Sequence, residues 1–170
     1  FSRQISITLQ NLELLEETRR RLREVNLLLD YSRRLGSLSE TDLLQALCTT
    51  ALEVIPEAEA AWVALWEPRE DALVPRAAHG YADESSLMDV HFAVTPAEAS
   101  ALARVFQQGQ VARIDEVNFV RDYALVGEDL LRYRQANKGK LPLSTLMLPL
   151  GSGERVLGVF VIENFSQNAA

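Results

Sequence analysis

Residues able to perform redox or nucleophilic chemistry are few in this sequence. Cys48 is the only cysteine among 170 residues, so no internal disulfide can form and no second thiol can resolve an oxidised one. Cys48 falls on the apolar stripe of an expected helix, with Leu44, Leu47, Ala51 and Ile55 at helical spacing. We therefore interpret Cys48 as a small buried hydrophobe and not as a reactive thiol.

Metal binding and acid–base catalysis also lack a supporting pattern. His79 and His91 are the only histidines, and neither has further ligands at the spacing of a metal site. No Ser-His-Asp arrangement and no catalytic pair of carboxylates is recognisable in the sequence. We expect no enzymatic activity, no metal and no cofactor.

A small-molecule pocket needs only a few convergent polar groups among apolar ones. The candidates for these groups are His79, His91, Arg113, Tyr123 and Thr145. Arg113 is the candidate for an anionic ligand, and a surface arginine at a strand end is an equally good interpretation. Residues 116–142 are the least regular segment and suit a lid, since long irregular loops in compact domains are often functional.

The apolar pattern predicts the elements that would position these groups. Helices are expected over 39–55, 95–109 and 128–136, the second with Thr95 as its N-cap and Pro96 at its first position. Strands are expected over 61–66, 73–79, 88–94, 111–115, 145–150 and 155–163, the last two as a hairpin. Pro75 marks its strand as an edge or bulged strand. The predicted fold is α+β, with a central antiparallel sheet of about six strands flanked by helices on both sides.

Composition excludes some classes of partner. The formal net charge is −7 and the sequence pI is about 4.9, which argues against general affinity for nucleic acid or anionic membranes. No apolar stretch approaches the ~18 residues of a membrane span, and no signal peptide is visible. The chain begins without Met, in what resembles mid-helix sequence. We expect a cytoplasmic fragment of a longer protein.

Residues 1–36 predict one long helix that serves as a signalling element. The first 35 residues contain no Gly or Pro, and Leu15, Leu22 and Leu29 repeat every seven residues, with Val25 at a second seam position. A helix of this length would extend about 50 Å at ~1.5 Å per residue, beyond what its own domain can cover. We expect a parallel homodimer through this helix; the alternative is a helix that packs along its own domain.

Several stretches resemble GAF domains. Residues 58–67 (AEAAWVALWE) are similar to the first strand of that family, and residues 76–81 (RAAHGY) to the second. The closing hairpin of the family resembles residues 143–150 (LSTLMLPL) and 156–164 (VLGVFVIEN). The resemblance covers roughly residues 28–165, so residues 37–170 are predicted to form a GAF/PAS-like domain that lacks its final helix. Residues 5–17 (ISITLQNLELLEE) resemble the tail of a preceding GAF domain.

The resemblance implies a regulatory role in a multidomain signalling protein such as a sensor histidine kinase. Some GAF domains bind bilins, which usually need a pocket-side cysteine, and others are methionine sulfoxide reductases, which need several cysteines. The Asn-Lys…Phe…Asp-Glu signature of the members that bind cyclic nucleotides is not present in order.

Trp62 occupies a first-strand position that often faces the pocket in this family. With Ala64 and Trp66 on the same face, its indole would fill much of the space, which favours a small flat apolar ligand or none. We expect a small-molecule-sensing input domain that passes its signal through a dimeric helix to neighbouring domains. The alternative is a ligand-free dimerisation and relay module with a filled pocket.

Overall fold

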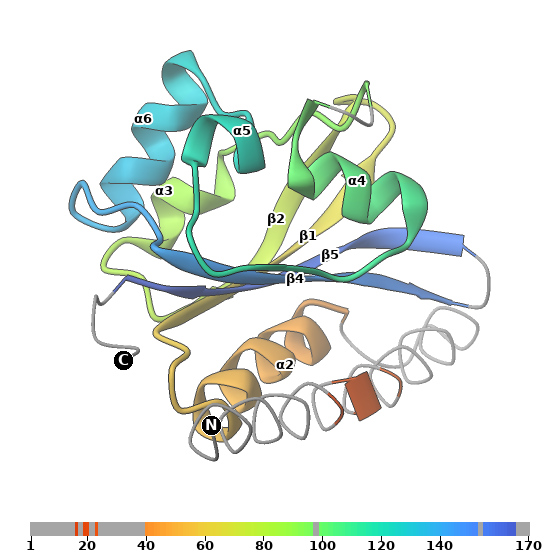
Figure 1. Cartoon of the computed structure of the whole chain (residues 1–170), viewed down its shortest axis with the longest axis vertical. Coiled ribbons are helices and arrows are strands. Elements are labelled where there is room, and N and C mark those ends of the chain that lie inside the picture. The colour runs from red at the N-terminus through yellow and green to blue at the C-terminus, as the bar shows by residue number, and fades with distance from the viewer. Residues whose placement is uncertain are drawn as a thin grey trace, which may run out of the picture.

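The computed structural model describes residues 40–96, 99–152 and 155–165, together with Glu16, Arg19, Arg20 and Arg23. One antiparallel sheet has the strand order β2-β1-β5-β4-β3. Its strands are β1 (Ala60–Glu67), β2 (Ala72–His79), β3 (Ala112–Ile114), β4 (Ser144–Ser152) and β5 (Arg155–Asn164). Helix α2 (Glu40–Val54) covers one face, and the opposite face carries α3 (Glu84–Met88), α4 (Ala101–Gln108), α5 (Phe119–Tyr123) and α6 (Gly127–Ala136) (Figure 1). The predicted α+β class, with helices on both sides of an antiparallel sheet, is confirmed.

The sheet of the described residues has five strands, because the strand expected over 88–94 is reduced to a single bridge. Leu73 on the edge strand β2 exchanges two backbone hydrogen bonds with Phe92, of 2.9 and 3.0 Å. The next residue of β2 that points to the same edge is Pro75, which has no N–H to donate. The neighbouring His91 N–H is donated instead to the Asp129 side chain at 3.1 Å. Pro75 also lies beside the bulge of β2, as its position in the sequence predicted.

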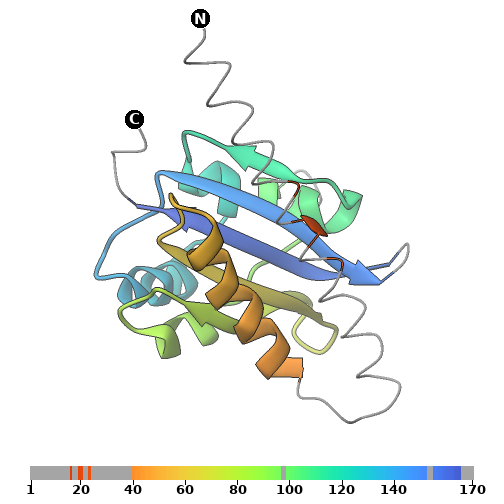
Figure 2. The ribbon, with the colours of Figure 1, turned by 90° about the horizontal axis from the view of Figure 1, so that it is seen from below.

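Two apolar cores lie on the two faces of the sheet. Helix α2 lies across one face of the sheet (Figure 2). The core beneath it contains Leu44, Leu47, Cys48 and Ala51 of the helix, packed on side chains of β1, β2, β4 and β5. The other core lies between the sheet and helices α3–α6. Strands β1 and β5 contribute to both cores, which explains why nearly every residue in them is apolar.

Helix α4 begins later than the sequence predicted. Its N-cap is Ser100, whose hydroxyl accepts a hydrogen bond from the Ala103 N–H at 2.9 Å, so Thr95 is not the cap. Ser100 is buried and accepts the hydrogen bond of an N–H in the first helical turn from inside the core. Thr95, in contrast, is exposed. The helix ends, as predicted, at Gly109, which has a left-handed conformation with φ of 67°.

The expected long helix over 1–36, with Leu15, Leu22, Val25 and Leu29, lies outside the described residues. The four described residues of this stretch are helical and exposed. Within the described part of the chain, no helix is long and apolar enough to cross a membrane.

Candidate functional site

A buried carboxylate lies in the core between the sheet and helices α3–α6. In β5, Glu163 follows Val159 and Val161 at two-residue steps and shares their face of the sheet, opposite Ala60 of β1. The Glu163 side chain is buried, with 1% of the residue exposed. The alternation of the strand therefore places an acidic group where the sequence pattern is otherwise apolar.

Three tyrosine hydroxyls donate hydrogen bonds to this carboxylate. Tyr81, on the connection that follows β2, donates to Oε1 of Glu163. Tyr123, the last residue of α5, donates to Oε2 at 2.5 Å, and Tyr133 of α6 donates to the same oxygen. Tyr123 and Tyr133 are fully buried, and Tyr81 is 8% exposed. We call Glu163 and these three tyrosines the Glu163 cluster.

Short helices hold two of these tyrosines over the sheet. The Asn118 side chain caps α5 by accepting from the Arg121 N–H at 3.1 Å, and the buried Asp122 accepts from the Asn118 N–H at 2.8 Å. These two reciprocal bonds define a helix of a single turn, which ends with Ala124 in the left-handed region. The ring of Phe119 then stacks on Tyr123 with centroids 4.5 Å apart.

The charge of Glu163 has no cationic partner among the described residues. The ion pairs in this part of the chain all involve other carboxylates. Burial raises the pKa of Glu163, and the tyrosine hydrogen bonds, which stabilise the charged form, offset this rise in part. Burial also raises the pKa of the three tyrosines, and the negative charge of Glu163 raises it further. Their hydroxyls therefore stay protonated and act as donors.

Thr145 allows the cluster to hold Glu163 in either protonation state. The Thr145 hydroxyl donates to the Ile162 carbonyl at 3.0 Å, and its oxygen lies 3.1 Å from the Tyr123 hydroxyl. When Glu163 is charged, Tyr123 donates its proton to the carboxylate. When Glu163 is protonated, it can donate to Tyr123, which then donates to Thr145. In each arrangement the hydroxyls of Tyr123 and Thr145 both donate a hydrogen bond.

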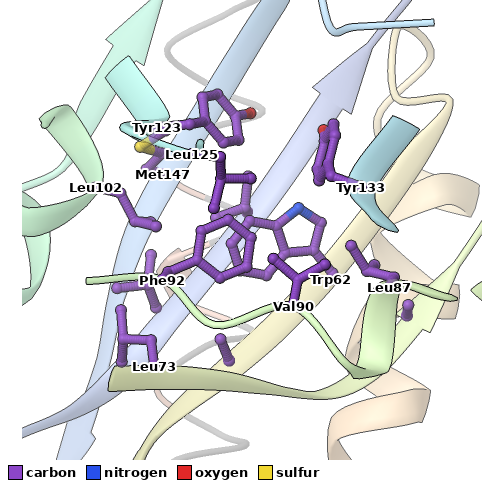
Figure 3. Packing of buried hydrophobic residues seen from close by; sticks show 14 of the residues in the cluster. Trp62, Leu73, Leu87, Val90, Phe92, Leu102, Tyr123, Leu125, Tyr133 and Met147 are labelled. Atoms are coloured by element: carbon purple, nitrogen blue, oxygen red, sulfur yellow. The ribbon is translucent and has the colours of Figure 1, made fainter. Parts of the chain in front are cut away.

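Trp62 borders the cluster and fills the adjacent space. Its ring stacks on Phe92, with centroids 4.6 Å apart and an interplanar angle of 13°. Figure 3 shows the indole nitrogen on the side of the ring that faces Tyr123 and Tyr133. The buried Nε1–H has no hydrogen-bond partner among the described residues, although it is near enough to Glu163 to favour the charged carboxylate slightly.

The structure brings together three of the six residues predicted for a pocket: Trp62, Tyr123 and Thr145. The other three lie at the surface. The His79 ring is 4.0 Å from Glu84, and the His91 ring lies between Glu70 at 3.4 Å and Asp129 at 3.9 Å. Arg113 pairs with Asp115 at 3.2 Å and its side chain is 50% exposed, as in the surface interpretation of this residue.

Sequence reasoning missed Glu163, Tyr81 and Tyr133. One signal was available for Glu163, since it is an acidic residue in phase with Val159 and Val161 on an inward-facing side of a strand. No comparable signal existed for the tyrosines, which come from a connection and from a helix. Their meeting at one carboxylate depends on how those elements pack on the sheet.

Comparison with known proteins identifies the class of domain that this fold and site define. A family model described as the GAF domain matches residues 37–169. The chain therefore belongs to the GAF domain family. No curated protein matches the chain.

Solved structures with the same fold come from several kinds of protein. The GAF domain of Acinetobacter phosphoenolpyruvate-protein phosphotransferase has a TM-score of 0.58 and 16% identity, over 89% of this chain and 77% of that one. A methyl-accepting chemotaxis protein, residues 122 to 287, has a TM-score of 0.56 and 22% identity, over 82% and 80%. Free methionine-R-sulfoxide reductase from Neisseria meningitidis, in complex with its substrate, has a TM-score of 0.57 and 14% identity, over 90% and 76%.

Proposed function

We propose that this chain is a small-molecule-sensing input domain of a signal-transduction protein, and that its ligand binds at the Glu163 cluster. Membership of the GAF family supports a regulatory role. The similarity to a domain of a chemotaxis protein is in keeping with a signalling context. The ligand would lie between the sheet and helices α5 and α6, so binding would shift these helices.

The observation that carries the proposal is a buried carboxylate surrounded by tyrosine hydroxyls in an otherwise apolar core. Such a network contributes little to stability, because desolvation of the charge offsets its hydrogen bonds, and apolar side chains of similar volume are often as stable. Ionisable groups whose pKa is shifted by burial, as that of Glu163 is, cluster at functional sites. The segment 116–142, predicted as a lid, supplies Tyr123 and Tyr133 to the cluster.

A specific observation favours a second candidate, the ligand-free relay module. The stacked rings of Trp62 and Phe92 occupy the space beside the cluster, and the described part of the chain itself supplies three donors to Glu163. In this case the side chains that replace a ligand would hold α5 and α6 in one position.

The single cysteine supports a non-enzymatic role. Burial raises the pKa of the Cys48 thiol to about 12, and the charge of Glu84 adds to this effect. A thiol with so high a pKa is a poor nucleophile at neutral pH. Cys48 also lies in the core beneath α2, on the opposite face of the sheet from the Glu163 cluster.

A binding screen on the whole chain tests the proposal. Native mass spectrometry of the purified protein checks for a retained ligand, and thermal shift with cationic, neutral and anionic metabolites checks for added ones. We expect at least one compound to raise the melting temperature by several degrees, as ligand binding to the folded state alone requires.

Two variants locate the binding site of any such compound. E163Q should abolish the thermal shift, whereas E128Q, which removes an exposed glutamate of α6, should retain it. If no retained mass and no shift are found, the ligand-free relay replaces the sensing function. A shift that survives E163Q would place the ligand elsewhere.

A further inference from the structure

We propose that the ligand of the Glu163 cluster is a small organic cation, a primary amine with a hydroxyl or carbonyl oxygen next to its ammonium group. This ligand class presupposes the proposed function, since it applies to the same site. Two features of the cluster select this chemistry: a buried carboxylate with no cationic partner among the described residues, and a buried indole N–H that completes no hydrogen bond there.

The charge of the site selects for a cation. Glu163 is buried, and no cationic side chain of the described residues pairs with it. An anionic ligand would meet a second negative charge at short range in a medium of low dielectric constant. A neutral ligand would supply no counter-charge to the carboxylate. An ammonium group supplies both the counter-charge and N–H donors.

The aromatic side chains around the carboxylate strengthen this selection. The ring centroids of Phe119 and Tyr133 are 4.9 Å apart, and those of Tyr123 and Tyr133 are 5.9 Å apart. Tyr81 meets Phe165 edge to face, with centroids separated by 6.4 Å. These rings pack on one another around the carboxylate and exclude water, and a charge pair attracts more strongly in such surroundings of low dielectric constant. The apolar surroundings therefore strengthen the preference of the carboxylate for a cation.

The Trp62 indole supplies the second recognition element. Its Nε1–H is buried and lies near Glu163 but completes no hydrogen bond among the described residues. In Figure 3 the nitrogen is on the side of the ring that faces Tyr123 and Tyr133. A buried donor without an acceptor is unfavourable. An ammonium group cannot accept this bond, but an oxygen on the adjacent carbon of the ligand can. Because the indole lies near Glu163, the oxygen and the amine of the ligand must lie close together.

Tyr81 marks the place where the ammonium enters. It is the one tyrosine of the cluster outside a helix, and its hydroxyl alone binds Oε1 of Glu163, whereas Oε2 receives two hydroxyls. Displacing Tyr81 from Oε1 frees one carboxylate oxygen and leaves the bonds from α5 and α6 in place. Tyr81 is 8% exposed, whereas Tyr123 and Tyr133 are fully buried, and Phe165, which meets the Tyr81 ring, is half-buried.

Ligand binding should be coupled to the release of a proton. Burial raises the pKa of Glu163 in the free protein, which favours the neutral carboxyl, and an ammonium group at Oε1 favours the carboxylate. Any proton on Glu163 then leaves to the buffer as the amine binds. Isothermal titration calorimetry in two buffers of different ionisation enthalpy measures this release.

The experiment compares amines with neutral compounds of the same shape. We would titrate the whole chain with 2-aminoethanol and 2-amino-1-phenylethanol, and with the two diols in which a hydroxyl replaces the ammonium group. We expect the amines to bind at least about tenfold more tightly than the diols, because a hydrogen bond to a charged group is the stronger one. E163Q should remove this preference, and E128Q should keep it.

The role of the indole has its own variant. W62F keeps a ring against Phe92 and removes the N–H, so it should weaken binding of 2-aminoethanol more than binding of propylamine. Circular dichroism and thermal unfolding would check that each variant is folded. Equal losses for the two amines would remove Trp62 from the recognition of the ligand.

The possible failures separate this ligand class from the proposed function. If neutral or anionic compounds bind in an E163Q-sensitive manner and amines do not, the cationic ligand is wrong and the sensing site stands. If amine binding is unchanged in E163Q, the amine does not pair with Glu163 and the proposal is overturned. If no compound of any class binds, both proposals fail together.

Discussion

The protonation state of Glu163 depends on two opposing effects, its burial and its hydrogen bonds. Its carboxylate receives hydrogen bonds from α5, α6 and the connection that follows β2, and its charged form is favoured by those bonds and disfavoured by burial. The opposing effects leave the protonation of Glu163 sensitive to anything that changes its surroundings. A cationic ligand and a change of pH would both act through the same hydrogen bonds to α5 and α6.

The free energy of unfolding of the domain should depend on pH because of the raised pKa of Glu163. Below the ordinary pKa of 4.5 the carboxyl is protonated in the folded and unfolded states. As the pH rises above that value the unfolded state ionises first, because the folded pKa is raised, and the free energy of unfolding falls. The slope is at most about 1.4 kcal/mol per pH unit and ends once the pH exceeds the folded pKa.

Urea unfolding of the wild type and E163Q from pH 4 to 8 measures this effect. The difference in unfolding free energy, wild type minus E163Q, should become smaller or more negative as the pH rises above 4.5. E128Q, at an exposed position, serves as the control for the loss of one charge. A difference that grows with pH would mean that the cluster stabilises the carboxylate more than burial disfavours it.

Cys48 should be nearly inert in the folded protein. With a pKa raised to about 12 by burial, its thiolate fraction at pH 8 is on the order of one in ten thousand, and the side chain is inaccessible. We expect a disulfide-exchange reagent such as DTNB to react with the native protein at least about a hundredfold more slowly than with the protein in urea. Similar rates in the two conditions would show that α2 opens readily from the sheet.

Among the elements, β5 is the strand on which both the sheet and the site depend. It pairs with β1 on one side and β4 on the other, and it carries Glu163 near its end. Gly158 allows β1 to approach, because a Cβ at this position would lie 2.1 Å from the Ala64 carbonyl oxygen. A side chain here would separate the strands that align Trp62 with the cluster.

G158A should therefore destabilise the domain by roughly 2–3 kcal/mol through overpacking against the β1 backbone. Gly139 provides the matched control: it has a φ of 84° but no atom within 4 Å of an added Cβ. G139A should reduce stability by about 1 kcal/mol through backbone strain alone. Urea unfolding compares the two. A loss in G158A equal to or smaller than in G139A would contradict the close approach of β1 and β5.

For the whole molecule, a signal at the Glu163 cluster has to leave the domain, and the sequence predicts the route. We propose that the route is a homodimeric helix formed by residues 1–36, motivated by the seven-residue spacing of Leu15, Leu22 and Leu29. The whole chain should then be a dimer by light scattering. The paired change of Leu22 and Leu29 to Asn should shift it towards monomer and leave the circular dichroism of the sheet domain unchanged.

The control for this experiment is L131N, which replaces a leucine of α6 that is 61% exposed. This variant should remain dimeric if the seam lies in the N-terminal helix. A wild-type monomer at high protein concentration, or dissociation caused by L131N, would contradict the proposed route.

Local signals in the sequence account for most of the fold. The apolar stripe of residues 44–55 predicted α2, and the β-branched and aromatic runs predicted β1, β2, β4 and β5 close to their observed bounds. Pro75 predicted an edge strand, because proline has no N–H to donate to a neighbouring strand and this holds whatever its surroundings. The strand expected over 88–94 and the cap at Thr95 were wrong, because pairing at Phe92 and capping by Ser100 depend on neighbours outside the local pattern.

The sequence by itself determined that an antiparallel sheet with helices on both faces would form, and that Trp62 would point into one of its cores. These properties follow from the periodicity of apolar side chains, which each strand or helix carries alone. Only the tertiary structure decided that Tyr81, Tyr123 and Tyr133 meet at Glu163, while His79, His91 and Arg113 remain at the surface. Hydroxyl and carboxylate groups from segments up to 82 residues apart converge through the packing of helices on a sheet, and no local spacing records that convergence.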